Sequence, residues 1–222
     1  MPASPRAELV ATLRWLADAR LYSGTSGNVS VRDAGGFLVT PSGVPFDEIA
    51  PRHMVAMSLA GEIRGRAALV PSTEWRIHRD IYRSRPDAGA VVHSHAPFAT
   101  TVACLRRDVP AFHYMVAKAG GPSIRCARYA TYGTEALSRR ALEALDGRNA
   151  CLLANHGMVV LGADLRATRL LAQEVEGLCE TYWRALAIGE PAILSGAEMA
   201  NVLAKFRDYG LHRGRHTTRW RR

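Results

Sequence analysis

Hydrophobic positions along the chain repeat with a helical period in some segments and with a strand period in others. Leu9, Leu13 and Leu16 follow one another at steps of four and three, which predicts an amphipathic helix over residues 8–20. Comparable spacing and helix start or stop signals predict further helices over residues 74–85, 96–105, 134–146, 165–188 and 195–210. The helix over 165–188 has the strongest pattern, with one apolar stripe that runs through its whole length.

Short apolar or alternating runs between these helices predict strands. They cover residues 29–32, 37–39, 54–59, 91–95, 111–116, 124–129, 150–154 and 158–161. Turn residues at Gly35-Gly36 and around His156-Gly157 favour hairpins, whereas other strands are separated by helices. We therefore expect an α/β fold, a three-layer αβα sandwich on a mixed, largely antiparallel sheet.

The helix over 74–85 starts after Pro71-Ser72-Thr73-Glu74. Ser72 or Thr73 is the expected N-cap residue, which leaves Glu74 in the first turn. A carboxylate in that position commonly interacts only with the helix dipole, but it can also face a pocket. His78 lies one turn further on, and we interpret it as a packed or hydrogen-bonded residue.

Length and composition limit the class of protein to which this chain can belong. With 222 residues, of which 48% are hydrophobic, the chain can form one domain, which we place at residues 1–211. We find no apolar run of membrane-spanning length and no pattern of a secretion signal, and the four cysteines form no C-x-x-C pair. These features favour a reducing, cytoplasmic location and argue against a disulfide framework, a thiolate zinc site and a membrane partner.

The formal net charge of +9 comes from arginine rather than lysine. Five arginines lie in residues 213–222, so we expect residues 212–222 to form a basic, mobile tail. A short basic run attracts phosphate backbones, but no recognition module accompanies it, and we expect no nucleic-acid partner.

Two apolar runs end in histidine. Val91-Val92 precedes His93-Ser94-His95, and residues 151–154 precede Asn155-His156-Gly157. Side chains two positions apart on a strand share a face, so His93 and His95 can converge on one ion. Alternatively, one of these histidines caps the end of the strand, and the other is an ordinary polar residue whose hydrogen bonds are satisfied. However, two buried strands that each deliver an imidazole favour a divalent metal as the shared partner.

Three turns of small residues lie beside strand ends or a helix start: Ser26-Gly27-Asn28, Ser42-Gly43 and Ser72-Thr73. Their backbone N–H groups and hydroxyls can hold a phosphate together with a helix N-terminus, although each alone is only a turn. The sequence contains no P-loop and no Gly-x-Ser-x-Gly elbow, and neither Lys118 nor Lys205 lies in an apolar strand that suits a Schiff base. Carbonyl chemistry would therefore depend on a metal.

Seven segments resemble the class II aldolase/adducin family, in the same order, and within it the members that act on L-fuculose 1-phosphate most. The segments are GTSGNVSVR at 24–32, STEWRIH at 72–78, SRPDAGAVVHSHA at 84–96, HYM at 113–115, AGGPSI at 119–124, YATYGT at 129–134 and NHG at 155–157. The similarity extends from about residue 5 to residue 211.

The resemblance implies a zinc ion on His93, His95, His156 and Glu74, with Glu74 leaving the metal on substrate binding and acting as the general acid/base. It implies reversible cleavage of a ketose 1-phosphate, such as L-fuculose 1-phosphate, to dihydroxyacetone phosphate and a short aldehyde such as lactaldehyde. It also implies homotetramers with sites between subunits. The residues that it assigns to phosphate are Gly27, Asn28, Ser42, Gly43, Ser72 and Thr73; Tyr114 would handle the aldehyde proton in a neighbouring subunit's site, and Tyr132 and Tyr209 would line the aldehyde pocket.

Alternatives inside the family stay open. An aldolase for 5-deoxyribulose or methylthioribulose 1-phosphate shares the dihydroxyacetone phosphate half of the substrate. A pentulose-phosphate 4-epimerase resembles this chain less, because such enzymes carry Asp at the position of Glu74. Adducin-like binding proteins lack the metal histidines. The chain departs from the fuculose-phosphate members at Tyr132, where they carry Phe, and in the arginine-rich extension from His212.

Overall fold

The computed structural model describes residues 4–22 and 24–209, with side chains placed as far as Phe206. The helices are α1 (Pro5–Asp18), α2 (Trp75–Ser84), α3 (Pro97–Cys104), α4 (Glu135–Leu145), α5 (Leu165–Ile188) and α6 (Gly196–Tyr209), and short 3₁₀ turns are η1 (Pro51–His53) and η2 (Tyr114–Ala119). The strands are β1 (Asn28–Asp33), β2 (Gly36–Val39), β3 (Val55–Met57), β4 (Ala90–Ser94), β5 (Arg125–Ala127), β6 (Ala150–Leu153) and β7 (Gly157–Gly162).

These strands form a 7-stranded sheet in the order β3-β2-β1-β4-β7-β6-β5. Neighbouring strands pair antiparallel except β5 and β6, which pair in parallel. β4 lies in the middle of the sheet. It contains His93 near its end, and His95 follows directly after its last residue. The prediction of a mixed, largely antiparallel sheet is confirmed.

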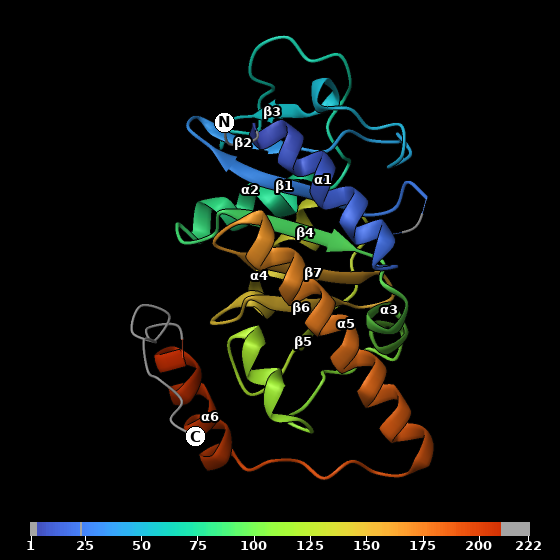
Figure 1. Cartoon of the computed structure of the whole chain (residues 1–222), viewed down its shortest axis with the longest axis vertical. Helices are drawn as coiled ribbons and strands as arrows, with labels where there is room; N and C mark the ends of the chain where they lie inside the picture. The colour runs from blue at the N-terminus through green and yellow to red at the C-terminus, as the bar shows by residue number, and fades with distance from the viewer. Residues whose placement is uncertain (1–3, 23, 210–222) are drawn as a thin grey trace, which may run out of the picture.

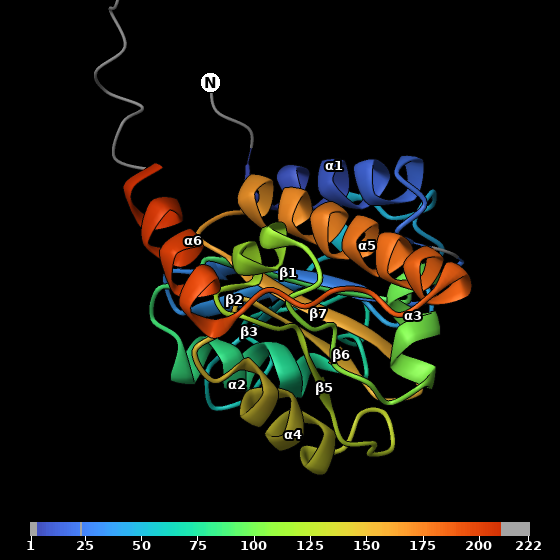
Figure 2. The same ribbon diagram turned by 90° about the horizontal axis from the view of Figure 1, so that it is seen from below.

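Helices cover both faces of the sheet. α1, α3 and α5 pack on one face, and α2 and α4 pack on the other, as Figures 1 and 2 show. Side chains that alternate along β4 divide between the two layers: Val92 packs with α1 and α5, whereas Val91 packs with α2 and α4. His93 has the parity of Val91, so the pleat of β4 turns its imidazole toward the start of α2.

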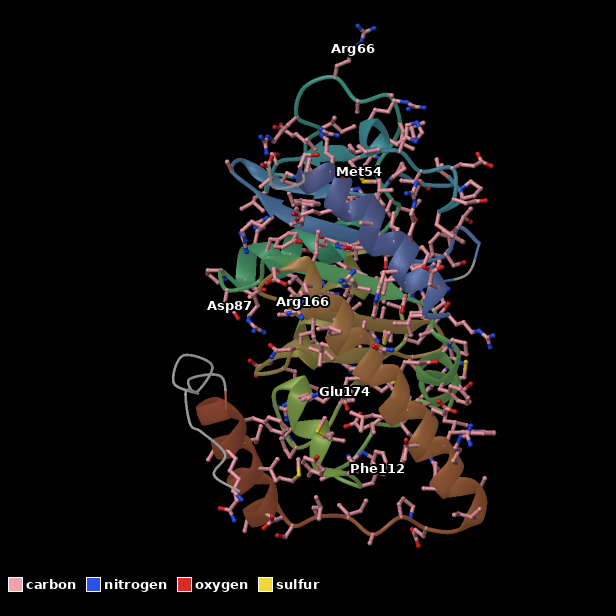
Figure 3. All side chains as sticks on the ribbon, viewed as in Figure 1. Met54, Arg66, Asp87, Phe112, Arg166 and Glu174 are labelled. Atoms are coloured by element: carbon pink, nitrogen blue, oxygen red, sulfur yellow. The ribbon has the colours of Figure 1, made fainter. Side chains whose placement is uncertain are left out.

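Charged side chains occupy the outer surface of these layers. Arg66, Asp87 and Arg166 are exposed, and Arg66 extends away from the molecule at the top of Figure 3. None of the helices within residues 4–22 and 24–209 is long and apolar enough to cross a membrane. The predicted basic tail at 212–222 lies outside the described residues, and its boundary stays a prediction.

Two local predictions are wrong. Residues 111–116 do not form a strand: backbone bonds pair Val109 with Ile124, and the chain then turns into η2 from Tyr114. In addition, the N-cap of α2 is Glu74 rather than Ser72 or Thr73, because the helix begins at Trp75. The Ser72 hydroxyl instead accepts the Glu74 N–H at 3.3 Å, and the Glu74 side chain is left free to point away from the helix.

Helix α3, which follows His95 almost directly, is fixed at its start by a side chain from α5. Its N-cap, Ala96, offers no side-chain acceptor. Glu176 supplies one: its two carboxylate oxygens accept the N–H groups of Phe98 and Ala99 at 2.8 Å each. One carboxylate thus satisfies two N–H groups that a helix leaves unpaired at its N-terminus.

Glu176→Gln should lower the free energy of unfolding by about 1–2 kcal/mol, because an amide can accept only one of these two bonds with its oxygen. Urea denaturation would measure the change. The matched control is Glu180→Gln on the same helix, which removes only a partly exposed pair with Arg184, worth about 0.5 kcal/mol. Equal effects of the two variants would contradict the capping role.

Candidate metal centre and active site

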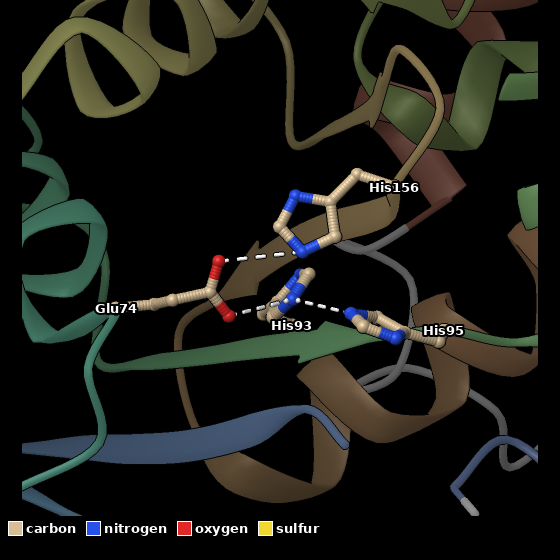
Figure 4. A group of neighbouring side chains, drawn as sticks. All are labelled: Glu74, His93, His95 and His156. Atoms are coloured by element: carbon tan, nitrogen blue, oxygen red, sulfur yellow. Dashed lines mark hydrogen bonds and ion pairs between the residues drawn. The ribbon is translucent and has the colours of Figure 1, made fainter. Parts of the chain in front are cut away.

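Four side chains from three parts of the chain converge at one end of the central strands. The Nε2 atom of His93 lies 3.0 Å from Glu74 Oε2 and 3.2 Å from the Nε2 atom of His95. His156, in the turn between β6 and β7, places its Nε2 atom 3.3 Å from Glu74 Oε1. Figure 4 shows the carboxylate facing the three imidazoles. One ligand atom from each residue lies within 4.8 Å of the others.

Glycines allow the chain segments around this cluster to approach one another. A Cβ atom on Gly27 would lie 2.7 Å from the His93 carbonyl oxygen, and Gly27 also has a φ of 93°. A Cβ atom on Gly157 would collide with the Ser94 carbonyl oxygen. Because both clashes involve backbone atoms beside the histidines, only glycine fits at these positions without moving a predicted ligand.

The residues present fit a divalent cation. Oε1 of Glu74 is buried and lacks a hydrogen-bond partner among the described residues. A buried carboxylate oxygen without a partner is unfavourable unless a positive group such as a cation faces it. Nδ1–H of His93 donates to the Met158 carbonyl oxygen at 2.9 Å, which leaves Nε2 as the ring nitrogen that faces the cluster. Three imidazoles and one carboxylate are a donor set typical of zinc.

The charges of the cluster are coupled. Burial opposes ionisation of Glu74, but His93, His156 and Asn28 outweigh it and lower the pKa of the carboxyl to about 2. Burial and the nearby His93 lower the pKa of both His95 and His156 to about 4. A negative carboxylate and two neutral imidazoles therefore stand ready as ligands near neutral pH.

The cluster opens into a cavity of about 320 Å³. Apart from Tyr114 and Tyr209, every residue predicted to bind substrate or phosphate lines it: Gly27, Asn28, Ser42, Gly43, Ser72, Thr73 and Tyr132, with Glu74, His95 and His156 at its floor. The loops around Ser42 and Ser72 are held together by Ser42 N–H to Val70 O at 3.1 Å and Ser72 N–H to Thr40 O at 3.0 Å. Turns far apart in sequence thus form one wall.

Two predicted tyrosines are not among the lining residues of this cavity. Tyr114 is half-exposed, lines a separate cavity of about 830 Å³ and stacks with Phe206 at 6.5 Å between ring centroids. Tyr209 is the last residue of α6, and its side chain lies outside the described residues. The structure of one chain therefore leaves the predicted roles of both tyrosines untested.

Sequence reasoning missed Asn155 and Tyr129, which also line the cavity. Asn155 has a φ of 54°, and its side-chain oxygen accepts from Arg106 Nε at 2.7 Å. A signal for it was present, because asparagine tolerates the left-handed region that a tight turn before His156 requires. Tyr129 begins the YATYGT segment, whose second tyrosine alone was assigned a role.

The chain is similar to known proteins over most of its length. The family described as Class II Aldolase and Adducin N-terminal domain matches residues 7–183. The chain is 54% identical over 202 residues to the 5-methylthioribulose-1-phosphate/5-deoxyribulose-1-phosphate aldolase of Rhodospirillum rubrum, with 91% of this chain and 90% of that protein covered. It is 47% identical over 192 residues to the L-fuculose phosphate aldolase of Escherichia coli, covering 86% and 88%.

Among solved structures, an L-fuculose 1-phosphate aldolase superposes with a TM-score of 0.89 at 39% sequence identity, over 93% of this chain and 98% of that chain. The expected resemblance and the expected three-layer fold are thereby confirmed. The named relatives are aldolases, which confirms the prediction of an enzyme. The chain belongs to the class II aldolase and adducin family, as an enzyme of the class II aldolase type.

Proposed function

We propose that this protein is a zinc-dependent aldolase that reversibly cleaves a 5-deoxypentulose 1-phosphate to dihydroxyacetone phosphate and a short aldehyde. The observation that carries the proposal is the cluster of Glu74, His93, His95 and His156, of which all but the buried His93 line a cavity walled by hydroxyl-bearing turns. A metal centre suits the carbonyl end of such a substrate, and the turns suit its phosphate.

The phosphate would lie against the turns at 27–28, 42–43 and 72–73. Ser42, Ser72 and Thr73 line the same cavity, and Thr73 and Glu74 immediately precede helix α2. A helix N-terminus carries partial positive charge, which favours an anion there. The proposed phosphate residues are those that the resemblance assigns: Gly27, Asn28, Ser42, Gly43, Ser72 and Thr73.

Zinc held by the three histidines and Glu74 would polarise the substrate carbonyl and stabilise the negative charge that develops on its oxygen. The chain itself must move protons. Cleavage removes a proton from the C4 hydroxyl, breaks the C3–C4 bond and leaves the electron pair on the C2–C3 fragment, which then takes a proton at C3. Glu74 is the acid at the floor of the cavity, and we assign it the proton at C3.

The low pKa of Glu74 is compatible with this role. Burial alone would raise the pKa, and contacts with His93, His156 and Asn28 keep it low. A carboxylate that moves away from the imidazoles loses these stabilising contacts, so its pKa rises toward the range in which it can carry a proton.

Tyr114 and Tyr209 would complete the site from a neighbouring copy of the chain. Tyr114 is half-exposed and does not line the cavity of its own chain. As in the tetramers implied by the resemblance, we assign the proton on the aldehyde oxygen to Tyr114 of an adjacent subunit, and we place Tyr132 and Tyr209 around the aldehyde.

The aldehyde half separates the two candidate substrates. A 5-deoxypentulose 1-phosphate yields a two-carbon aldehyde, bare or with a methylthio group, whereas L-fuculose 1-phosphate yields lactaldehyde. The 54% identity to the aldolase for the former and the 47% identity to the aldolase for the latter favour the 5-deoxypentulose. The sequence motifs and the structural similarity support L-fuculose 1-phosphate as the second candidate.

We expect a coupled assay for dihydroxyacetone phosphate to give a kcat/KM about tenfold higher for 5-deoxyribulose or 5-methylthioribulose 1-phosphate than for L-fuculose 1-phosphate. The reverse order would favour fuculose. Turnover of a pentulose 5-phosphate to its C4 epimer, without dihydroxyacetone phosphate from any substrate, would replace the aldolase proposal with an epimerase. No turnover of any of these compounds by zinc-loaded protein would favour a binding role.

A further inference from the structure

A chain of hydrogen bonds leads from Glu74 through Asn28, which also lines the cavity, into the protein interior. Asn28 Nδ2 donates to Glu74 Oε2 at 3.2 Å, and the Asn28 side-chain oxygen is bonded to Nε2 of His78. Nδ1 of His78 lies 2.6 Å from Ser30 Oγ, which in turn lies 2.8 Å from the Tyr82 hydroxyl. Apart from Glu74, none of these residues belongs to the proposed metal ligands.

The two secondary-structure elements that carry this chain present it through their own periodicity. Asn28 and Ser30 are two residues apart on β1, so they share one face of the sheet. His78 and Tyr82 are four residues apart on α2, so they share one side of the helix. All four are at most 2% exposed, which excludes solvent from the whole path.

The direction of every bond in the chain can be deduced. A carboxylate only accepts, so the Asn28 amide N–H points to Glu74 and its oxygen must accept from His78 Nε2–H. Burial lowers the pKa of His78 to about 3, so its neutral ring has a single N–H and Nδ1 accepts. Ser30 must then donate to His78, and the Tyr82 hydroxyl must donate to Ser30.

Tyr82 is a suitable end for such a chain. Burial raises the pKa of its phenol well above the usual value, so the hydroxyl keeps its proton. Its ring packs against Phe37 at 5.4 Å and lies under the Arg32 guanidinium at 4.8 Å, which fixes the ring in place. The Tyr82 hydroxyl, which ends the chain that begins at Glu74, therefore has a fixed position and a fixed protonation state.

We propose that Tyr82, Ser30 and His78 are positioning residues that lock the Asn28 side-chain amide in the one orientation that donates a hydrogen bond to Glu74. Glu74 favours the N–H end of the amide on one side, and His78 holds the amide oxygen on the other. Without His78 the amide is held at one end only, and an Asn28 that rotates or flips would weaken its bond to the carboxylate or present its oxygen to it. The inference rests on the proposed acid/base role of Glu74, because a misdirected amide matters to turnover only through that carboxylate.

The central test is His78→Leu. This change removes the hydrogen-bond donor to Asn28 and fills the buried site with an apolar side chain of similar size. We expect kcat to fall about tenfold to a hundredfold, with zinc content still near one per chain, because the three histidines remain. His78→Gln, whose amide can still donate to Asn28, should recover most of the lost kcat.

Two milder variants and a control distinguish an effect on kcat from a loss of folding. Tyr82→Phe and Ser30→Ala each remove a hydroxyl group, and each should lower kcat less than His78→Leu, in the same direction. Ser138→Ala is the matched control: Ser138 is fully buried and donates to Asp80 Oδ2 at 2.6 Å on α2, but it lies outside the chain. It should leave kcat unchanged at a similar cost in thermal stability.

A double-mutant cycle separates positioning from a general structural effect. If His78 acts through Glu74, then His78→Leu should cause no further loss of kcat in a Glu74→Gln background. Additive losses would overturn the inference, as would wild-type kcat in His78→Leu or, where that protein does not fold, in both Tyr82→Phe and Ser30→Ala. Full activity of Glu74→Gln alone would instead refute the acid/base role of Glu74 on which the inference rests. A zinc-loaded wild-type protein that releases no dihydroxyacetone phosphate from any ketose 1-phosphate would refute the proposed function, which is a separate outcome.

Discussion

Replacing His95 with alanine should remove both the zinc ion and turnover. His95 contributes an imidazole of lowered pKa, about 4, to a cluster whose ligand atoms lie within 4.8 Å of one another. It is also partly open to the cavity, so alanine leaves room for water rather than a packing defect. With one imidazole lost, we expect kcat/KM to fall about a thousandfold, since Lewis-acid stabilisation is worth several kcal/mol.

Metal analysis of the purified protein and the dihydroxyacetone phosphate assay would measure the two effects together. His53→Ala is the matched control, because His53 only accepts a hydrogen bond from Ala50 N–H at 3.1 Å in η1, outside the cluster. Stripping the wild-type protein with a chelator should reproduce the loss, and added zinc should restore activity. Activity that persists in metal-free protein would disprove the metal mechanism.

The three histidines of the cluster could be predicted because their signals are local, whereas Glu74 was assigned to the metal only through the family resemblance. Strand alternation places His93 and His95 on one face, and a hairpin turn delivers His156, so periodicity alone pairs them. The strand predicted over residues 111–116 failed because an apolar run does not reveal whether a sheet edge is available. The isolated bridge between Val109 and Ile124 lies just before that segment, which then turns into η2 at Tyr114.

The rest of the site depends on tertiary register that sequence does not carry. His78 was expected to be a packed or hydrogen-bonded residue, and it is, but its partners Asn28 and Ser30 become neighbours only because β1 pairs with β4 beneath α2. The direction of the Glu74 side chain likewise follows from the start of α2 at Trp75, one or two residues later than capping rules predict. Capping rules do not fix a helix start to within one or two residues, so they do not reveal which way this carboxylate points.

Glu74→Gln should keep the fold and the metal and lose about a hundredfold to ten-thousandfold in kcat. The amide matches the carboxylate in shape, and its oxygen can still accept from Asn28, which donates to Oε2 at 3.2 Å. It cannot gain and release a proton, so the step at C3 loses its acid. The three imidazoles stay in place to hold zinc, and for this reason zinc content should remain near one per chain while turnover disappears.

The control for this variant is the same substitution at Glu135, an exposed carboxylate in the first turn of α4. Both residues stand at a helix start, but only Glu74 faces imidazoles, so the pair of variants separates helix-dipole effects from proton transfer. Glu135→Gln should change stability by a few tenths of a kcal/mol and leave kcat at the wild-type value. If Glu74→Gln behaves in the same way, Glu74 is only a helix-end carboxylate, and the proton at C3 must come from another group. A thousandfold loss confined to Glu74→Gln, with zinc retained, would assign the proton to the carboxylate rather than to the metal.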